Sequence, residues 1–219
     1  MYRVTHGRNL HAFKVSGLKT LGEFMEPLHR HANLSRIRRA LDWGCGCGRL
    51  TMFFLAAKDG PEVFGCDIDA EAIAWCNEFL EPAAFAVIEP MPPTAYPDAH
   101  FDLILSYSVF THLTRQVQQA WLAEMYRVLA PGGFFLASTH GIFAHQFSSG
   151  STSAQFPPEG IVDLLIDSTL GEIAPKDYYR ATFQSKEYTL CEFGKYFQMV
   201  EYIERGANNF QDLAVMQKR

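Results

Sequence analysis

The stretch that decides the fold reads Leu41-Asp42-Trp43-Gly44-Cys45-Gly46-Cys47-Gly48-Arg49-Leu50, with glycine at every second position from 44 to 48. The largely apolar run just before it, residues 40–43, predicts a short buried strand. Alternating glycines after a strand let the main chain turn tightly and approach a ligand closely. In an open parallel sheet, ligands lie beyond the carboxyl ends of the strands. The stretch therefore predicts a ligand site at the end of a parallel strand.

A carboxylate follows at a distance that suits a nucleoside. The buried-strand run Val63-Phe64-Gly65-Cys66 predicts a second strand over 62–67, and Asp67 closes it, 19 residues after Gly48. An ionised carboxylate at that place can accept hydrogen bonds from both hydroxyls of a ribose. The glycine turn and the carboxylate of Asp67 together predict a site that binds a nucleoside.

Two other nucleotide sites fit the glycine turn poorly. A dinucleotide fingerprint requires G-x-G-x-x-G, and its third glycine position is occupied here by Arg49, whose side chain would stand where helix and strand pack closely. A phosphate-binding loop requires Gly-Lys-Ser or Gly-Lys-Thr after the strand, and none follows. Both alternatives are therefore disfavoured.

Around this stretch, predicted strands and helices alternate, which indicates a parallel sheet with helices on both faces. Helices are expected over residues 16–30, 49–58, 70–80, 114–129 and 185–195, and strands over 40–43, 62–67, 84–88, 101–106, 133–139, 197–204 and 211–217. The last two strands form a terminal hairpin that supplies an antiparallel strand. We expect one three-layer α/β domain over 1–219 with a mixed seven-stranded sheet, and residues 1–39 as a helical cover near the mouth of the site.

Two segments interrupt the alternation. An extended loop follows the third strand and is marked by Pro90, Pro92, Pro93 and Pro97. Residues 141–183, here called the lid segment, are rich in Ser, Gly and Pro in the first half and aromatic in the second. A loop of that length inside a compact domain is usually a lid or a binding element, so we expect the lid segment to form the acceptor pocket.

At these residues the chain resembles the class I S-adenosylmethionine-dependent methyltransferases. Four stretches carry the resemblance, in order between residues 40 and 139: Asp42-x-Gly44-x-Gly46-x-Gly48, Gly65-Cys66-Asp67-Ile68-Asp69, Phe101 to Ser106 with Val109-Phe110-Thr111-His112-Leu113, and Leu129-x-Pro131-Gly132-Gly133. The resemblance implies the Rossmann-like methyltransferase fold, with a mostly parallel seven-stranded sheet and an antiparallel C-terminal strand. It also implies S-adenosylmethionine as cofactor and S-adenosylhomocysteine as product.

The resemblance assigns the two halves of the cofactor to different residues. Gly44 and Gly46, with the backbone of Cys45 between them, would face the methionine part, and the backbone of Ser106 would meet its ammonium group. Asp42 would support the residues that bind the cofactor without contacting the cofactor itself. Four further residues would hold the nucleoside: Asp67 on the ribose hydroxyls, Ile68 against the adenine, and Glu89 and Met91, with Pro90, in the loop that closes over it.

The methyl group of a sulfonium is already activated, so the enzyme's main task is alignment of the acceptor, and no nucleophilic Ser or Cys arrangement is present. A general base is needed only when the acceptor carries a proton. His112, six residues after the fourth strand, is the candidate base; the alternative is that it caps or positions the next helix. Further candidates for the acceptor side are Tyr107, His140, Tyr178 and Tyr179, with His145 a weaker one, although the two lid tyrosines could serve only to pack the lid segment.

Composition excludes several classes of protein. With 48% hydrophobic and 20% charged residues, the chain is globular, and no apolar run approaches the roughly 20 residues that span a bilayer. The N-terminus lacks a signal-peptide core, and five cysteines form no disulfide framework or zinc-site spacing, so we expect a cytoplasmic protein without metal.

The net charge of -5 argues against a dedicated nucleic-acid binder. Residues 1–39 hold eight basic and two acidic residues, a basic region that either meets an anionic partner or is a solvated face.

The sequence thus predicts methyl transfer from S-adenosylmethionine to a small-molecule acceptor, by a monomer or homodimer that acts on no nucleic acid or membrane. Gly206 and Gln211-Asp212-Leu213 resemble methyltransferases that accompany glycan assembly, which makes a saccharide one possible acceptor. Two alternatives stay open. One is a non-catalytic cofactor-binding scaffold of the same fold. The other is an aminopropyl transferase, which would need acidic residues after the fourth strand, where the chain has Ser106-Tyr107-Ser108.

Overall fold

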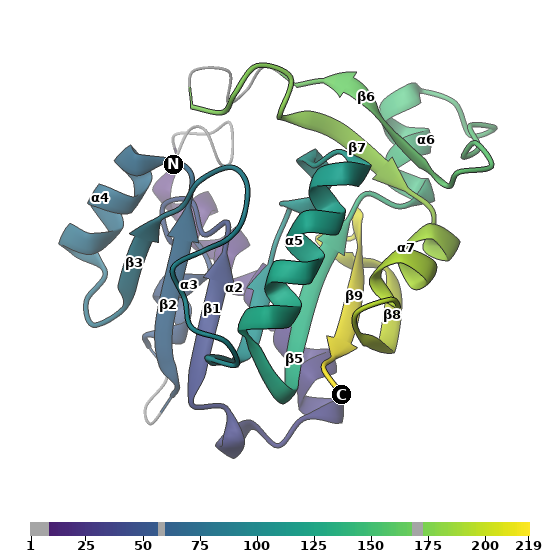
Figure 1. Cartoon of the computed structure of the whole chain (residues 1–219). Coiled ribbons are helices and arrows are strands. Elements are labelled where there is room, and N and C mark those ends of the chain that lie inside the picture. Colours follow the sequence, from purple (N-terminus) through teal and green to yellow (C-terminus); the bar gives the residue numbers. More distant parts are fainter. Residues whose placement is uncertain (1–8, 57–59, 168–172) are drawn as a thin grey trace.

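The computed structural model describes residues 9–56, 60–167 and 173–219. A central seven-stranded sheet has the order β3-β2-β1-β4-β5-β9-β8 (Figure 1). Its strands are β1 (Arg39–Trp43), β2 (Glu62–Asp67), β3 (Ala84–Val87), β4 (Phe101–Ser106), β5 (Leu129–Thr139), β8 (Gln198–Ala207) and β9 (Gln211–Gln217). The first five strands pair in parallel, and β9 runs antiparallel to both β5 and β8. This confirms the predicted Rossmann-like fold with its antiparallel C-terminal strand.

Helices cover both faces of this sheet. One core holds Leu41 and Trp43 of β1 against α5 (Arg115–Val128) and α7 (Lys186–Phe193). The other holds Leu103 and Leu105 of β4 against α2 (Leu10–His31) and α3 (Thr51–Phe54). The remaining elements are α4 (Ala70–Phe79), which packs along β2 and β3, and the short helices η1 (Leu34–Arg36) and η2 (Phe110–His112). Burial on both faces explains why these strands read as nearly continuous apolar runs.

Several predicted boundaries were wrong for identifiable reasons. Helix α2 begins at Leu10 rather than at 16, because the Asn9 side chain accepts a hydrogen bond from the Ala12 N–H at 3.0 Å and caps the helix. Helix α3 covers only 51–54 of the predicted 49–58, because the glycine turn continues to Leu50; residues 57–59 lie outside the described part. Strand β5 starts at Leu129, four residues early, because Leu129 already pairs with β4.

The lid segment contains more regular structure than the sequence indicates. It holds α6 (Ile142–Ser149) and a two-stranded antiparallel sheet of β6 (Ile161–Ile166) and β7 (Arg180–Gln184), with residues 168–172 outside the described part. Figure 1 shows this small sheet at the top of the view, above α5. Strand β7 is pinned there because the Thr182 hydroxyl donates to the Leu113 carbonyl at 3.0 Å.

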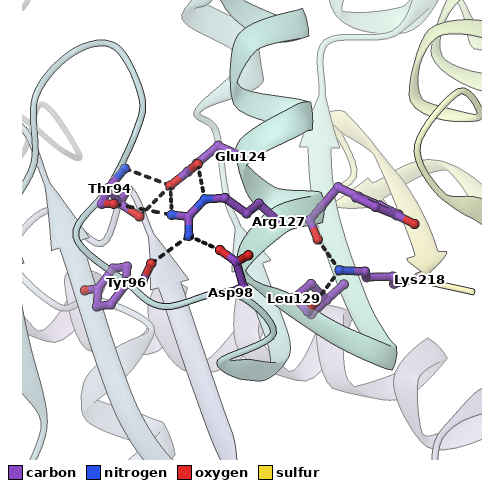
Figure 2. Close-up of polar contacts among 8 residues, drawn as sticks. Thr94, Tyr96, Asp98, Glu124, Arg127, Leu129 and Lys218 are labelled. Atoms are coloured by element: carbon purple, nitrogen blue, oxygen red, sulfur yellow. Dashed lines mark hydrogen bonds and ion pairs between the residues drawn. The ribbon is translucent and has the colours of Figure 1, made fainter.

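An ion pair between the buried Glu124 and the half-buried Arg127 fixes the Pro-rich loop after β3 against α5 (Figure 2). Thr94 donates to Glu124 from its N–H at 2.7 Å and from its hydroxyl at 2.6 Å. Arg127, bonded to Glu124, also donates to the Tyr96 carbonyl at 2.9 Å and to Asp98 at 2.7 Å. Burial opposes ionisation of Glu124, but the hydrogen bonds from Arg127 and Thr94 outweigh it and lower its pKa. The loop is therefore held in one path beside the sheet.

None of the helices in the described ranges combines the length and the apolar character that a membrane crossing requires. Residues 1–8, the beginning of the predicted helical cover, lie outside those ranges.

Candidate active site

A cavity of about 620 Å³ opens at the carboxyl ends of β1, β2 and β4. Its wall combines the glycine turn, the ends of β2 and β4, the first turns of α2, and the lid segment. This is the edge at which the sequence predicted a ligand site, and the volume lies in the range of about 300–1,000 Å³ that is usual for small-molecule pockets.

The glycine turn is held by backbone conformations that favour glycine. Gly44, Gly46 and Gly48 have φ of +77°, +53° and +71°. A side chain at Gly44 is also excluded by space, because a Cβ there would lie 2.2 Å from Cγ2 of Val109. Both Gly44 and Cys45 donate their N–H to the carbonyl of Cys66, at 2.8 and 3.1 Å, which ties the turn to β2. Gly44, Cys45 and Gly46 all line the cavity.

Asp67 joins the turn to the end of β2. Its Oδ2 accepts the Gly46 N–H at 2.8 Å and its Oδ1 accepts the Asp69 N–H at 2.9 Å. Burial raises the pKa of this carboxyl, while those two backbone bonds oppose the shift. Each carboxylate oxygen has a further lone pair, and the side chain lines the cavity, so it can accept hydrogen bonds from a diol. Its neighbours Ile68 and Asp69 line the same wall.

Asp42 also reaches the cavity, although the sequence predicted only an indirect role for it. Its Oδ2 accepts a hydrogen bond from the Thr51 hydroxyl at 2.6 Å. Burial raises its pKa to about 6, partly offset by that bond and by the positive charge of Arg49. At pH 7 the carboxylate is therefore mostly ionised, and it both braces α3 and adds negative charge to the wall.

His112, the last residue of η2, forms part of the cavity wall. Its Nδ1 lies 2.9 Å from the carbonyl of Arg180 on β7, and because a carbonyl only accepts, Nδ1 carries the proton of this bond. Burial lowers the pKa of His112 to about 4, so the ring is neutral at pH 7 and Nε2 keeps a lone pair. The ring stacks on Tyr179 at 4.0 Å between centroids.

Three side chains of the lid segment complete this end of the cavity: Asp167, Tyr178 and Tyr179. The Asp167 carboxylate lies 3.8 Å from Nδ1 of His112. The Tyr178 hydroxyl donates to the Pro90 carbonyl, which also accepts from the indole N–H of Trp121 at 3.1 Å. The lid segment is thus tied to both the Pro-rich loop and α5.

The structure does not bring every predicted site residue to the wall. Glu89 and Met91 are exposed, and Ile88, one residue earlier, lines the cavity in their place. Ser106 is completely buried beneath the wall. His140 lies behind His112, with ring centroids 6.3 Å apart, and stacks on Phe183. His145, the weaker candidate, lies on α6, and its ring stacks on Phe156.

Other lining residues were missed by sequence reasoning because distant segments supply them. They include Asn9, Ala12, Phe13 and Ser16 of α2, Arg49 after the glycine turn, Ser108 after β4, and Asn208 of the last hairpin. The Asn208 amide donates to the Tyr107 hydroxyl at 2.8 Å and to the Thr20 hydroxyl at 2.9 Å. Of these residues, only Asn9 could have been identified from the sequence, because asparagine is a common N-cap at the start of a helix. Within the described ranges, no cluster of three or more His, Cys, Asp or Glu side chains could hold a metal ion.

Comparison with known proteins places this site in context. Residues 40–133 match the family model described as "Methyltransferase domain". A curated relative, thiocyanate methyltransferase 1 of Arabidopsis thaliana, is 34% identical over 49% of this chain and 48% of its own length, so the chain spans about half of that relative. An S-adenosylmethionine-dependent methyltransferase from Clostridium acetobutylicum has a TM-score of 0.66 at 12% identity, covering 95% of this chain and 94% of its own.

A further similar structure is the 1,6-didemethyltoxoflavin-N1-methyltransferase of Burkholderia thailandensis, solved with 1,6-didemethyltoxoflavin and S-adenosylhomocysteine bound. It has a TM-score of 0.64 at 16% identity and covers 97% of this chain and 82% of its own. At such identities the two solved structures show a shared fold.

Proposed function

We propose that this protein transfers a methyl group from S-adenosylmethionine to a small-molecule acceptor, and two findings support this: the match of residues 40–133 to the methyltransferase-domain model and the similarity to a curated methyltransferase. One observation carries the proposal. A single cavity joins a glycine turn and a diol-accepting carboxylate, Asp67, to a neutral histidine, His112, that keeps an open lone pair.

The residues at the first end of this cavity suit the cofactor. Gly44 to Gly46 allow close approach of the main chain, and Asp67 accepts the ribose hydroxyls. Ile68 and Ile88 offer an apolar surface for the adenine. S-adenosylmethionine supplies a methyl group that is already activated by its positively charged sulfur. The protein's own part is to hold that sulfur and the acceptor in line and to exclude water.

His112 suits the removal of a proton from the acceptor. Its Nδ1 is committed to the Arg180 carbonyl, so Nε2 is the nitrogen that can accept a proton. A pKa of about 4 makes it a weak base, yet a hydroxyl oxygen becomes a very strong acid as its bond to the methyl carbon forms. A weak but correctly placed base is then sufficient. The proton passes to Nε2 and from there to solvent, while the carbon–sulfur electron pair stays on sulfur.

The size and the lining of the cavity favour a small acceptor with a ring. Cofactor and acceptor must share about 620 Å³. Three aromatic residues line the same cavity as His112: Trp121, Tyr178 and Tyr179. The similar Burkholderia enzyme is named for the acceptor 1,6-didemethyltoxoflavin, which supports a small-molecule acceptor here. Asp212, part of the stretch that suggested a saccharide, accepts a hydrogen bond from the Tyr202 hydroxyl within the last hairpin. A saccharide acceptor stays an alternative, which the monosaccharides in the acceptor panel below test.

Calorimetric titration tests the cofactor assignment. The wild-type protein should bind S-adenosylhomocysteine, and Asp67→Ala should weaken this binding by about 1–3 kcal/mol because the ribose hydroxyls lose their acceptor. Glu62→Ala is the matched control, since Glu62 is an exposed carboxylate at the other end of the same strand and should leave affinity unchanged. Equal affinities of wild type and Asp67→Ala would contradict the placement of the ribose.

Methyl uptake from labelled S-adenosylmethionine by a panel of small ring acceptors then tests catalysis. The panel should include hydroxylated aromatics, heteroaromatics and monosaccharides, with the His112→Gln protein as the negative control. Tight cofactor binding without turnover of any acceptor would favour a non-catalytic scaffold of the same fold.

A further inference from the structure

Ser108, between β4 and η2, has a backbone conformation that is uncommon for a residue with a side chain. Its φ is +60°, in the left-handed region that favours glycine. The residue also lines the cavity. A residue keeps such a conformation only where its surroundings fix it, and positions of this kind gather at functional sites. The contacts of Ser108 therefore identify what holds this part of the wall.

A closed ring of three hydrogen bonds fixes Ser108. Its N–H donates to the Ser138 hydroxyl at 2.8 Å, and that hydroxyl donates to the side-chain carbonyl of Gln211 at 2.7 Å. The Gln211 amide donates back to the Ser108 hydroxyl at 2.9 Å. Ser138 of β5 is completely buried, and Gln211, the first residue of β9, is only 6% exposed. Water therefore competes little for these bonds.

The turn at Ser108 leads directly to His112. The Ser108 hydroxyl lies 3.0 Å from the Thr111 hydroxyl in η2. The next residue, Val109, accepts the His112 N–H on its carbonyl at 2.9 Å. Its side chain lies against the glycine turn, since a Cβ at Gly44 would be 2.2 Å from its Cγ2. A change of conformation at Ser108 would therefore move both Val109 and η2.

We propose that Gln211 is a positioning residue for methyl transfer: by holding Ser108 in its left-handed conformation, it sets the place of His112 in the cavity wall. The inference rests on the proposed function, in which His112 takes the proton of the acceptor. Gln211 is not among the described residues that line the cavity, so it acts through Ser108 rather than by contact with a ligand. Without its amide, residue 108 would relax toward the negative φ that side chains favour.

A pair of substitutions tests this mechanism through activity. Gln211→Ala should lower kcat for a hydroxyl acceptor roughly 10- to 100-fold, because a misplacement of about 1 Å has effects of that size. The KM of the acceptor and the calorimetric affinity for S-adenosylhomocysteine should stay close to wild type, because hydrogen bonds to the Cys66 carbonyl hold the glycine turn separately. Adding Ser108→Gly to Gln211→Ala should restore kcat, because glycine adopts a φ of +60° without support from neighbouring side chains.

A second measurement needs no acceptor. The pKa of His112, followed by NMR of its ring protons and assigned with the His112→Gln protein, should rise from about 4 towards 6.5 in Gln211→Ala, because a displaced ring loses part of its burial. It should stay near 4 when Ser108→Gly is also present. A residue that only stabilised the fold would leave both this pKa and the kcat of the folded protein unchanged.

Two further variants complete the design. Ser138→Ala breaks the ring at another bond and should have the same effects, so it replaces Gln211→Ala if circular dichroism shows that Gln211→Ala does not fold. Gln217→Ala is the matched control. It removes an amide at the other end of β9, where Gln217 donates to the Gly132 carbonyl at 3.0 Å, and it should leave kcat and the pKa of His112 unchanged.

The outcomes separate this inference from the proposed function. An unchanged kcat together with an unchanged pKa of His112 in Gln211→Ala would overturn the role of Gln211 and leave the proposed function intact. Equal losses with and without Ser108→Gly would overturn it as well. If the wild-type protein methylates no acceptor, the proposed function fails, and the pKa of His112 in the variants still decides whether Gln211 positions the ring.

Discussion

The two ends of the cavity are built in different ways. The end assigned to the cofactor comes mainly from one piece of chain, Gly44 to Asp69. Its geometry is fixed by backbone N–H groups, which donate to the Cys66 carbonyl and to the Asp67 carboxylate. The end assigned to the acceptor comes from side chains on η2, α5 and the lid segment. Local main-chain geometry can be shared across a family, whereas side chains on separate segments can change one at a time. The lid segment, which supplies part of the acceptor end, lies outside residues 40–133, whereas the whole of Gly44 to Asp69 lies inside the range that matches the family model.

The ends also differ in charge. Asp42 and Asp67 are held beside backbone N–H groups and hydroxyls, which suits a polar, charged ligand. His112 and His140 are buried against aromatic rings, and burial lowers the pKa of each to about 4, with His112 adding to the effect on His140. The acceptor end therefore stays neutral near pH 7 apart from Asp167. Four predictions probe this division.

The largest effect is expected from a side chain in the glycine turn. Gly44→Val places a β-branched residue at φ +77° and a Cβ 2.2 Å from Val109. We expect a loss of about 3 kcal/mol or more of unfolding free energy and no measurable binding of S-adenosylhomocysteine. Urea unfolding and calorimetry measure both. Gly22→Ala is the control: a Cβ there meets nothing within 4 Å, so this helical position should gain stability by up to about 1 kcal/mol. Wild-type binding by Gly44→Val would contradict the described turn.

The next effect concerns the acceptor end alone. His112→Gln keeps a donor for the Arg180 carbonyl but removes the basic Nε2, so kcat for a hydroxyl acceptor should fall by roughly 10²–10⁴-fold. The affinity for S-adenosylhomocysteine, measured by calorimetry, should stay the same. If the turnover is unchanged, His112 serves only to position η2 and the lid segment. If cofactor affinity falls as well, the two ends are not independent.

Acid should remove the stability that the buried, neutral His112 contributes at the acceptor end. Because the pKa of His112 is about 4 in the folded chain and near 6.5 when unfolded, the unfolded state binds more protons between these values. His112 therefore contributes stability above pH 6.5 that is lost as the pH falls to 4, on the order of 3 kcal/mol. Asp42, with its raised pKa of about 6, acts in the opposite direction. The difference between wild type and His112→Gln in urea unfolding from pH 4 to 7.5 isolates the histidine, and parallel curves would refute its burial.

The smallest effect is expected where the lid segment meets the Pro-rich loop. Tyr178→Phe removes the donor to the Pro90 carbonyl, which keeps its bond from Trp121. We expect a loss of about 0.5–1.5 kcal/mol in unfolding free energy and unchanged binding of S-adenosylhomocysteine. A large loss of cofactor affinity would show that the Pro-rich loop couples the two ends.

Regular hydrophobic patterns made most of the sheet predictable. The bounds of β2 and β4 match their predictions, because both are short apolar runs with clear flanking residues. The lid segment was not predictable as α6, β6 and β7, because its Ser- and Gly-rich stretch follows α6 as a turn, with Gly150 at φ +66° as the helix cap. Strand β6 begins only at Ile161 and pairs with β7 across residues outside the described ranges, so nothing local identifies the pair as a sheet.

The sequence by itself determined the glycine turn, the acidic end of β2 and thus the cofactor end, because these depend on main-chain conformations that only certain residues allow. Tertiary structure alone decided that Arg49, Tyr107 and Asn208 meet in one wall, and that the Arg180 carbonyl sets the tautomer of His112. These contacts join residues up to 101 positions apart, from Tyr107 to Asn208, and no local pattern encodes such a distance. Their geometry arises only when the sheet and its covering helices pack together.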